Sequence, residues 1–249
     1  MSAFSYQVTS LPIRKEIPDA FRYAWGMIAA PGCWWSGEQR IAIATETRLA
    51  RKCRLCSERK AALSPYAVSG EHDHAGLLPA KAVEAAHRIS TDPARLKRSW
   101  YEDLLDADFT DGHYVEIVGI VAAMISIDQF HYSLGLELEP LPEPLAGAPS
   151  GYRPPGAGPA NAWVPMITTM KAAAEGDEED IYPLGQVGNV VSAMSLVPDA
   201  VRVLNRLSAV LYVPMENVAD PGYNEGRALE RPQMEFIAAR VSAINDCFY

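Results

Sequence analysis

Two cysteines three positions apart, Cys53 and Cys56, form the sharpest chemical motif in the sequence. At the start of a helix, this Cys-x-x-Cys spacing brings two sulfur atoms close enough to form a disulfide, and the helix N-terminus stabilises the thiolate of the first cysteine. Positive charge also lowers the pKa of a thiol, and basic residues surround the pair. These residues are Arg48, Arg51, Lys52, Arg54, Arg59 and Lys60. The motif therefore predicts a redox-active cysteine pair with a nucleophilic thiolate at neutral pH.

The histidines leave other interpretations of the cysteine pair open. Thiolates and imidazoles are zinc ligands, and His72 and His74 follow the pair closely enough to complete a structural zinc site. The two thiols are also compatible with an unreactive role in the core. His87 and His113 lie among helical residues and are interpreted as ordinary surface or hydrogen-bonded side chains. His131 is a weaker candidate for a role beside a cysteine site.

A glutamate and a cysteine near the end of the sequence form a second candidate site. Eleven residues separate Glu235 from Cys247, and a continuous helix would hold them about 18 Å apart at ~1.5 Å rise per residue. Asn245 and Asp246 form a favourable N-cap pair. A break at that pair would fold the chain back and bring the carboxylate to the sulfur, as a general base for a thiol requires.

The segment from Glu235 to Cys247 resembles the signature of the AhpD-like (alkylhydroperoxidase D-like) and carboxymuconolactone decarboxylase-like family. That signature is a glutamate, eleven residues, Cys-x-x-Cys, three residues and a histidine. In the first half of the sequence, residues 42–56 resemble the same signature, and residues 114–135 resemble the closing core helix of the family. The resemblance implies an all-helical fold, assembly into homo-oligomers, and a cysteine pair that reduces peroxides with a glutamate–histidine proton relay.

The resemblance also implies catalytic roles for particular residues. Glu235 matches the relay acid and Cys247 the first cysteine of the pair, while Cys53 and Cys56 match the cysteine pair in the first half. The expected activity is that of an alkylhydroperoxidase-like thiol peroxidase, an oxidoreductase that reduces alkyl hydroperoxides or disulfides. It would use no cofactor and no metal. Its partners would be a small-molecule peroxide, a thiol reductant protein and further copies of itself.

The sequence departs from the family signature in both halves. In the first half, Ile41 stands where the relay acid is expected and Lys60 where the histidine is expected, and Glu38 or Glu46 is the available substitute acid. In the second half, the sequence reaches Tyr249 one residue before the expected second cysteine. Some members of the superfamily carry selenocysteine in this motif, and its codon is easily read as a stop; a short natural terminus is the alternative. We therefore expect weak peroxidase activity from the chain as it stands.

Helical patterns dominate the segments that would position these residues. Apolar residues recur at a spacing of three to four, and strand patterns are scarce. The clearest segments are residues 82–88, 100–105, 114–132, 187–196, 200–213 and 232–244. The most apolar of them has almost no polar face and is expected in the core. The sequence therefore predicts an all-α fold.

A proline- and glycine-rich segment interrupts the helical patterns between residues 138 and 160. It contains seven prolines, a density that neither helix nor strand tolerates. We predict a helical domain carrying the Cys-x-x-Cys motif over residues 1–140, a linker over 141–160, and a second, partial AhpD-like helical segment over 161–249.

Composition and charge exclude several functional classes. The chain has 249 residues, of which 49% are hydrophobic and 21% charged, as in ordinary globular proteins. A net charge of -9 argues against a nucleic-acid binder. Residues 1–19 lack the apolar core of a secretory signal, and the longest apolar stretch, 115–127, is too short to span a bilayer. Four cysteines are too few for a disulfide-stapled secreted domain. The expected location is the cytoplasm, without membrane association.

The leading prediction is therefore a thiol-dependent oxidoreductase. Two alternatives remain from the sequence. One is a non-catalytic helical protein with a structural Cys/His zinc site. The other is a decarboxylase-lineage enzyme that acts on a small lactone.

Overall fold

The computed structural model describes residues 3–6, 9–185, 187–245 and 247. Within these residues the regular structure is helical, apart from one isolated antiparallel bridge between Gly158 and Met166. The predicted all-α fold is confirmed. The α-helices are α1 (Glu16–Ala29), α2 (Gly37–Ala50), α3 (Arg54–Ala61), α4 (Ala80–Thr91), α5 (Arg98–Leu104), α6 (Asp111–Ser133), α7 (Met170–Ala174), α8 (Asn189–Ser192), α9 (Pro198–Leu211) and α10 (Arg231–Ile244).

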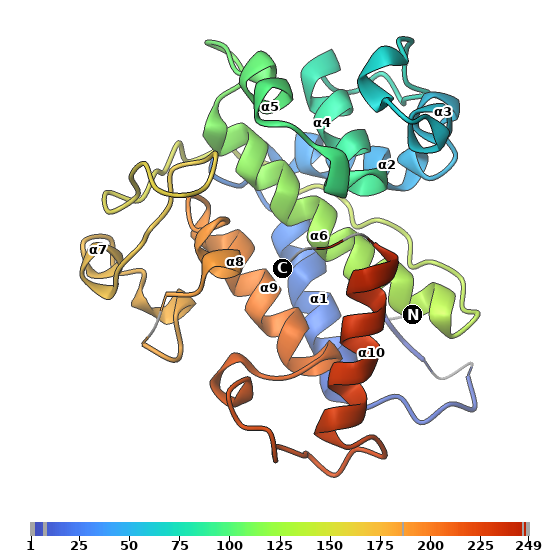
Figure 1. Cartoon of the computed structure of the whole chain (residues 1–249), viewed down its shortest axis with the longest axis vertical. Coiled ribbons are helices and arrows are strands. Elements are labelled where there is room, and N and C mark those ends of the chain that lie inside the picture. The colour runs from blue at the N-terminus through green and yellow to red at the C-terminus, as the bar shows by residue number, and fades with distance from the viewer. Residues whose placement is uncertain (1–2, 7–8, 186, 246, 248–249) are drawn as a thin grey trace.

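Helix α6 forms the centre of the fold, as its apolar sequence predicts. It crosses the molecule, and α1, α2, α4 and α9 pack against it (Figure 1). Ile117, Met124 and Ile127 have no exposed surface. At 23 residues and a mean hydropathy of 1.3, it is the one helix among the described residues that is long and apolar enough to cross a membrane. The apolar stretch 115–127 is too short by itself to span a bilayer, and α6 continues beyond it at both ends. The neighbouring helices cover most of α6.

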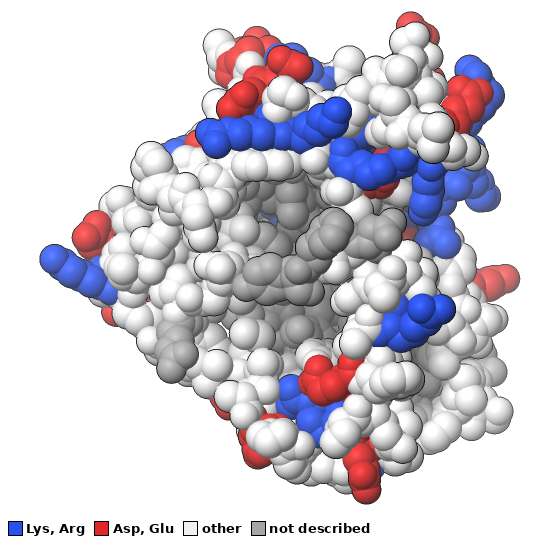
Figure 2. Space-filling model, viewed as in Figure 1, with Lys and Arg blue, Asp and Glu red and all other residues white. Residues whose placement is uncertain are grey.

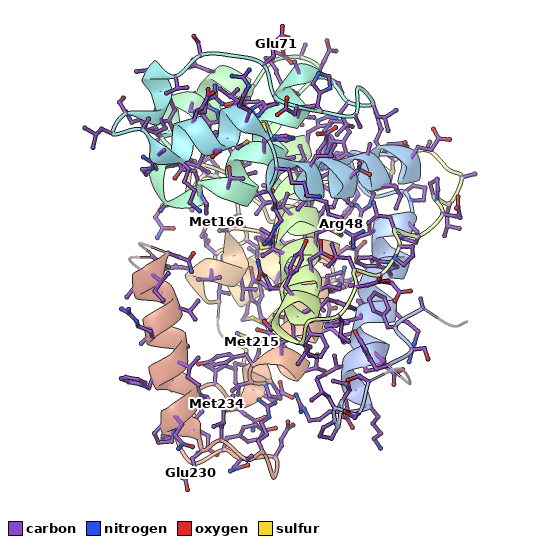
Figure 3. The ribbon with its side chains drawn as sticks, turned by 90° about the vertical axis from the view of Figure 1, so that its right-hand side faces the viewer. Arg48, Glu71, Met166, Met215, Glu230 and Met234 are labelled. Carbon is purple, nitrogen blue, oxygen red and sulfur yellow. The ribbon has the colours of Figure 1, made fainter. Side chains whose placement is uncertain are left out.

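Helix α2 lies beside α4 and carries one side of the candidate site. Its start is fixed by a capping box, in which the Ser36 hydroxyl accepts from the backbone of Gln39 and the Gln39 side chain accepts from the backbone of Ser36. Arg48, near the end of α2, forms two hydrogen bonds to the carboxylate of Asp128 in α6, at 2.9 and 2.8 Å (Figure 3). This bidentate pair holds α2 against the central helix.

The same hydrophobic core contains residues from both sides of the proline-rich segment. Helix α1 packs against α9 (Figure 1), and Phe21 of α1 and Leu207 of α9 belong to one buried cluster. The proline-rich segment itself runs along the surface beside the end of α1. Its backbone donates from Leu145 to the carbonyl oxygen of Ala29 at 2.8 Å and from Gly151 to that of Cys33 at 2.7 Å. The segment therefore connects two halves that share one core.

Helix α10 lies at the periphery. Among its residues Arg231 alone is buried, and its guanidinium donates to the backbone carbonyl oxygens of Asn217, Val218 and Asp220. Most of the helix surface faces outward (Figure 1). On the face shown in Figure 2, acidic and basic side chains are interspersed around the edge of the molecule.

Candidate metal centre

The two cysteines of the motif lie where α2 gives way to α3. Cys53 is the N-cap residue of α3, and Cys56 lies in its first turn. Both side chains are buried, with 1% and 3% of their surface exposed. The pKa of Cys53 is lowered: burial raises it, but hydrogen bonds from the backbone of Cys56 and from His72 and the backbone of Asp73 together outweigh the burial. The predicted thiolate therefore has a local structural basis.

The largest causes of this lowered pKa are hydrogen bonds and not the basic residues that flank the motif. Arg48 binds Asp128 in α6, as described above. On α3, Arg54 pairs with Glu58 one turn later, and Arg59 pairs with Glu84 of α4, at N–O distances of 2.9 and 2.8 Å. The sequence predicted a lowered pKa for Cys53, and the structure agrees in direction. The main cause is hydrogen bonding and not the positive charge of nearby arginines.

Two histidines converge on the sulfur atoms. The Nδ1 atom of His72 lies 3.4 Å from the Sγ atoms of both Cys53 and Cys56. The Nδ1 atom of His87 lies 3.3 Å from Sγ of Cys56. The four atoms all lie within 4.8 Å of one another. The group thus combines residues from the start of α3, from the loop before α4 and from α4 itself.

Each histidine contacts a carboxylate through Nε2, while its Nδ1 atom faces the sulfurs. Nε2 of His72 lies 2.7 Å from Oε2 of Glu84, and Nε2 of His87 lies 2.9 Å from Oε2 of Glu46. When Nε2 carries the proton and donates it to the carboxylate, Nδ1 presents a lone pair. Both imidazoles therefore turn an acceptor toward the sulfurs, which is the orientation that carboxylates impose on histidines that bind metals.

The carboxylates are themselves fixed by further donors. Glu84 accepts from Nη1 of Arg59 at 2.8 Å and from Nε1 of Trp100 at 3.1 Å. Burial raises the pKa of Glu84, but hydrogen bonds from His72 and Arg59 outweigh it and lower the pKa to about 2. Glu46, which has no exposed surface, accepts from the backbone of Ala75 at 2.8 Å.

The pKa values of the two histidines shift in opposite directions. Burial lowers the pKa of His72, but hydrogen bonds with Cys56 and Glu84 outweigh it and raise the pKa to about 10. Burial lowers the pKa of His87, and the hydrogen bond with Glu46 only partly opposes it. His72 would therefore give up its Nδ1 proton when it binds a metal.

These residues fit a tetrahedral zinc ion. With Zn–S of about 2.3 Å and Zn–N of about 2.1 Å, a sulfur and a nitrogen ligand lie about 3.6 Å apart. The observed Sγ–Nδ1 distances of 3.3 to 3.4 Å are close to this value. Two thiolates and two imidazoles suit zinc, whereas magnesium and calcium take oxygen ligands. Cys53, Cys56, His72 and His87 would hold the ion.

The 62–79 loop, which joins α3 to α4, reaches over this site. The carboxylate of Asp73 accepts from the backbone of Arg54 at 2.7 Å, and the backbone of Asp73 donates to Sγ of Cys53 at 3.4 Å. A cavity of about 330 Å³ lies between the loop and α4, lined by His72, Leu78 and Glu84 among others. The loop therefore separates the site from solvent, and the cavity approaches it from one side.

The sequence identified three of the four converging residues. The zinc interpretation named His74 in place of His87, and the structure contradicts that choice. His74 is exposed, and its Nδ1 atom accepts from the backbone of Gly76 at 2.9 Å. His87 was interpreted as an ordinary helical residue, and Glu46 was named only as a substitute relay acid. A signal for His87 was present, because it lies three positions after Glu84 and so on the same face of α4.

The second predicted site lies outside this group. Glu235 accepts from the hydroxyl of Tyr212 and from Arg231, and its pKa is lowered, first by the hydrogen bond from Tyr212. Cys247 is exposed beyond the end of α10, which stops at Ile244. Glu235 lies in the first turns of α10 and Cys247 beyond its other end, and neither belongs to the group of Cys53, Cys56, His72 and His87. The predicted break at Asn245-Asp246 falls partly outside the described residues, since Asp246 is not among them.

Comparisons of this chain with protein families, with curated proteins and with solved structures gave no match in any of the three.

Proposed function

We propose that this protein binds one zinc ion at Cys53, Cys56, His72 and His87, and that the ion is structural. The observation that carries this proposal is the convergence of the four ligand atoms within 4.8 Å, with each histidine oriented by its own carboxylate. Four protein ligands close the coordination sphere, and this is typical of structural rather than catalytic zinc sites.

The surroundings of the site give the ion a role in folding. Helix α3 has only eight residues, and helices of this length are marginal in water on their own. Its buried cluster consists of the two cysteines and Leu55, with Val68 packed beside it. So small an apolar cluster contributes little stability, and zinc binding would supply the missing free energy. The ion would fasten α3 and the 62–79 loop to α4, and thereby to the bundle.

Metal analysis of the purified protein tests the proposal. We expect about one zinc ion per chain, and expect Cys56→Ser and His87→Ala to lose it, because each removes a ligand from a closed site. His74→Ala is the matched control and should retain the ion, because the Nδ1 atom of His74 accepts from the backbone of Gly76 and His74 is not one of the four converging residues. Replacement by cobalt should give the intense visible absorption of a tetrahedral thiolate site. A protein without stoichiometric metal, or one that keeps it after both cysteines are changed to serine, would refute the proposal.

One observation favours a second function, the thiol-dependent oxidoreductase expected from the sequence. Cys56, His87 and Glu46 form a chain of thiol, imidazole and carboxylate at 3.3 and 2.9 Å. Such a chain activates a nucleophile in many enzymes. Steady peroxide consumption by the metal-free protein, in the presence of a thiol reductant, would support this function. The buried sulfurs favour the metal site. The AhpD-like relationship, the homo-oligomer and the cytoplasmic location remain predictions.

A further inference from the structure

We infer that the centre is a redox-controlled clasp, in which a hydroperoxide oxidises Cys53 and Cys56 to a disulfide, the zinc ion is lost and residues 69–77 of the 62–79 loop are freed. This inference rests on the proposed zinc site and adds its regulation. The structural reason is that residues 69–77 are attached to the fold mainly through the groups that bind or orient the metal.

The contacts of the loop show this dependence. His72 is a ligand, Asp73 binds the start of α3 and the sulfur of Cys53, and the backbone of Ala75 donates to Glu46. The two ends of the loop are attached independently of the metal. Tyr66 donates to the carbonyl oxygen of Arg95 at 2.9 Å, the carbonyl oxygen of Val68 accepts from Arg59 at 3.1 Å, and Leu78 packs against the main core. Most residues from 69 to 79 are exposed, so that hydrophobic burial contributes little to holding this part of the loop.

The cysteines are placed to exchange metal ligation for a disulfide. They stand three apart at the start of a helix, and their sulfurs belong to the same group of atoms within 4.8 Å. A disulfide requires the sulfurs to approach to about 2.05 Å. Because a disulfide carries no thiolate, the metal would lose two of its four ligands. Two imidazoles alone do not hold zinc in a structural site.

The reaction is balanced with one hydroperoxide. The thiolate of Cys53 attacks the terminal peroxide oxygen, the O–O bond breaks, and an alcohol leaves after taking up one proton. The resulting sulfenic acid is attacked by the thiolate of Cys56, an S–S bond forms, and water leaves after the second proton is taken up. The two sulfurs lose two electrons and the peroxide gains them. The cavity lined by His72 lies nearest the sulfurs, since Nδ1 of His72 is 3.4 Å from both, and the oxidant would enter from that side.

Loss of the clasp should be measurable as exposure of the loop to a protease. Glu71 lies in the 62–79 loop at the outer edge of the molecule (Figure 3). A protease that cleaves after glutamate needs several residues on either side in an extended conformation, and the pinned His72 and Asp73 prevent this. We therefore expect cleavage after Glu71 to accelerate at least tenfold once the disulfide forms.

The experiment uses the zinc-loaded full chain, with the change Cys33→Ser and Cys247→Ser so that one cysteine pair remains. The chain is treated with tert-butyl hydroperoxide. Zinc release is followed with a chelating dye, disulfide formation by mass spectrometry, and cleavage after Glu71 by the resulting peptides. We expect one zinc ion released per disulfide, faster cleavage, and reversal of both by dithiothreitol and zinc. The wild-type chain, analysed by peptide mapping, controls for any effect of the two serines on folding.

The outcomes separate this inference from the proposed function. A protein that never binds zinc refutes the proposed site itself. A protein that binds zinc but keeps it and both thiols under peroxide refutes the clasp alone, as does oxidation to sulfinic or sulfonic acids without a disulfide. Zinc release without faster cleavage after Glu71 would refute the role of the loop. The His74→Ala variant should behave like its parent in every assay.

Discussion

The two carboxylates behind the histidines have different surroundings, although they make the same kind of contact. Glu46 has no exposed surface, and its partner His87 is equally buried. Glu84 lines the cavity and shares its charge between His72 and Arg59. A hydrogen bond to a charged acceptor is stronger where water is excluded. Glu46 is therefore expected to orient its histidine more strongly than Glu84 does.

Neutralising these carboxylates should weaken metal binding without removing a ligand. We expect Glu46→Gln and Glu84→Gln to lower zinc affinity by ~10–100-fold, with the larger effect at Glu46, because an amide is a weaker acceptor for the imidazole N–H. Competition with a chelator of known affinity measures this. Glu58→Gln is the matched control, since Glu58 pairs only with Arg54 on the surface of α3. Equal affinities for all three variants would contradict the assigned roles.

A third cysteine, Cys33, should be protected from alkylation by its environment. Burial, and after it the nearby Glu116 carboxylate, raises its pKa from 9.0 to about 11. Because the folded pKa lies above the unfolded one, the neutral thiol favours the folded state below pH 9 and this contribution is lost as pH rises toward about 11. At pH 8 we expect iodoacetamide to modify the exposed Cys247 much faster than Cys33. Mass spectrometry of timed samples measures both, and equal rates in the folded protein would contradict the prediction.

At the level of single residues, the sequence predicted the chemistry better than its location. The Cys-x-x-Cys spacing and His72 were sufficient to predict a group of cysteine and histidine side chains, and the structure brings these three residues together. His87 and Glu46 were not identified as partners, because their meeting depends on the packing of α4 against α2. A single sequence does not show which faces of two helices are in contact. His74, the nearer candidate in the sequence, is excluded by the local turn that directs its ring to Gly76.

Helices α6 and α9 approach each other closely at Gly119. A Cβ atom at this position would lie 2.5 Å from Cβ of Ala200, closer than side chains tolerate. The absence of a side chain is therefore what allows the crossing. Gly26 in α1 has no neighbour within 4 Å of an added Cβ atom and provides a comparison within the same fold.

Adding a methyl group at these glycines should have opposite effects. We expect Gly119→Ala to lower the free energy of unfolding by ~1–3 kcal/mol, because the helices must move apart. We expect Gly26→Ala to raise it by up to about 1 kcal/mol, because alanine favours a helix over glycine. Urea denaturation followed by circular dichroism measures both. A stabilised Gly119→Ala variant would show that the crossing is not close-packed.

Most helices with strong apolar periodicity could be predicted from the sequence, among them the seven-residue α5, whereas the five-residue α7 could not. The pattern over residues 114–132 corresponds to α6, and that over 200–213 to α9. The pattern over residues 187–196 contains only the four-residue α8, since Pro198 begins the next helix. Helix α1 was missed, although Phe21, Trp25 and Ile28 repeat at helical spacing. Hydrophobic periodicity reports a buried face, but it does not measure how long the hydrogen-bonded turns continue.

For the molecule as a whole, the proline-rich segment was the clearest landmark and also the hardest to interpret. Its composition predicts irregular, extended chain, and the structure has it so. Whether it divides separate cores depends on the helices on either side of it. Their apolar faces are equally suited to a shared or a separate core, and in the structure α1 and α9 belong to one buried cluster.

The pairing of α1 with α9 determines the order in which a newly synthesised chain can complete its fold. The four residues of the candidate metal centre lie between Cys53 and His87, so that this part can assemble from neighbouring segments. Helix α1 instead contacts α9, which begins only at Pro198. Contacts between distant segments form slowly, because a long stretch of chain must be closed first. Helix α1 is thus synthesised long before the helix that covers it.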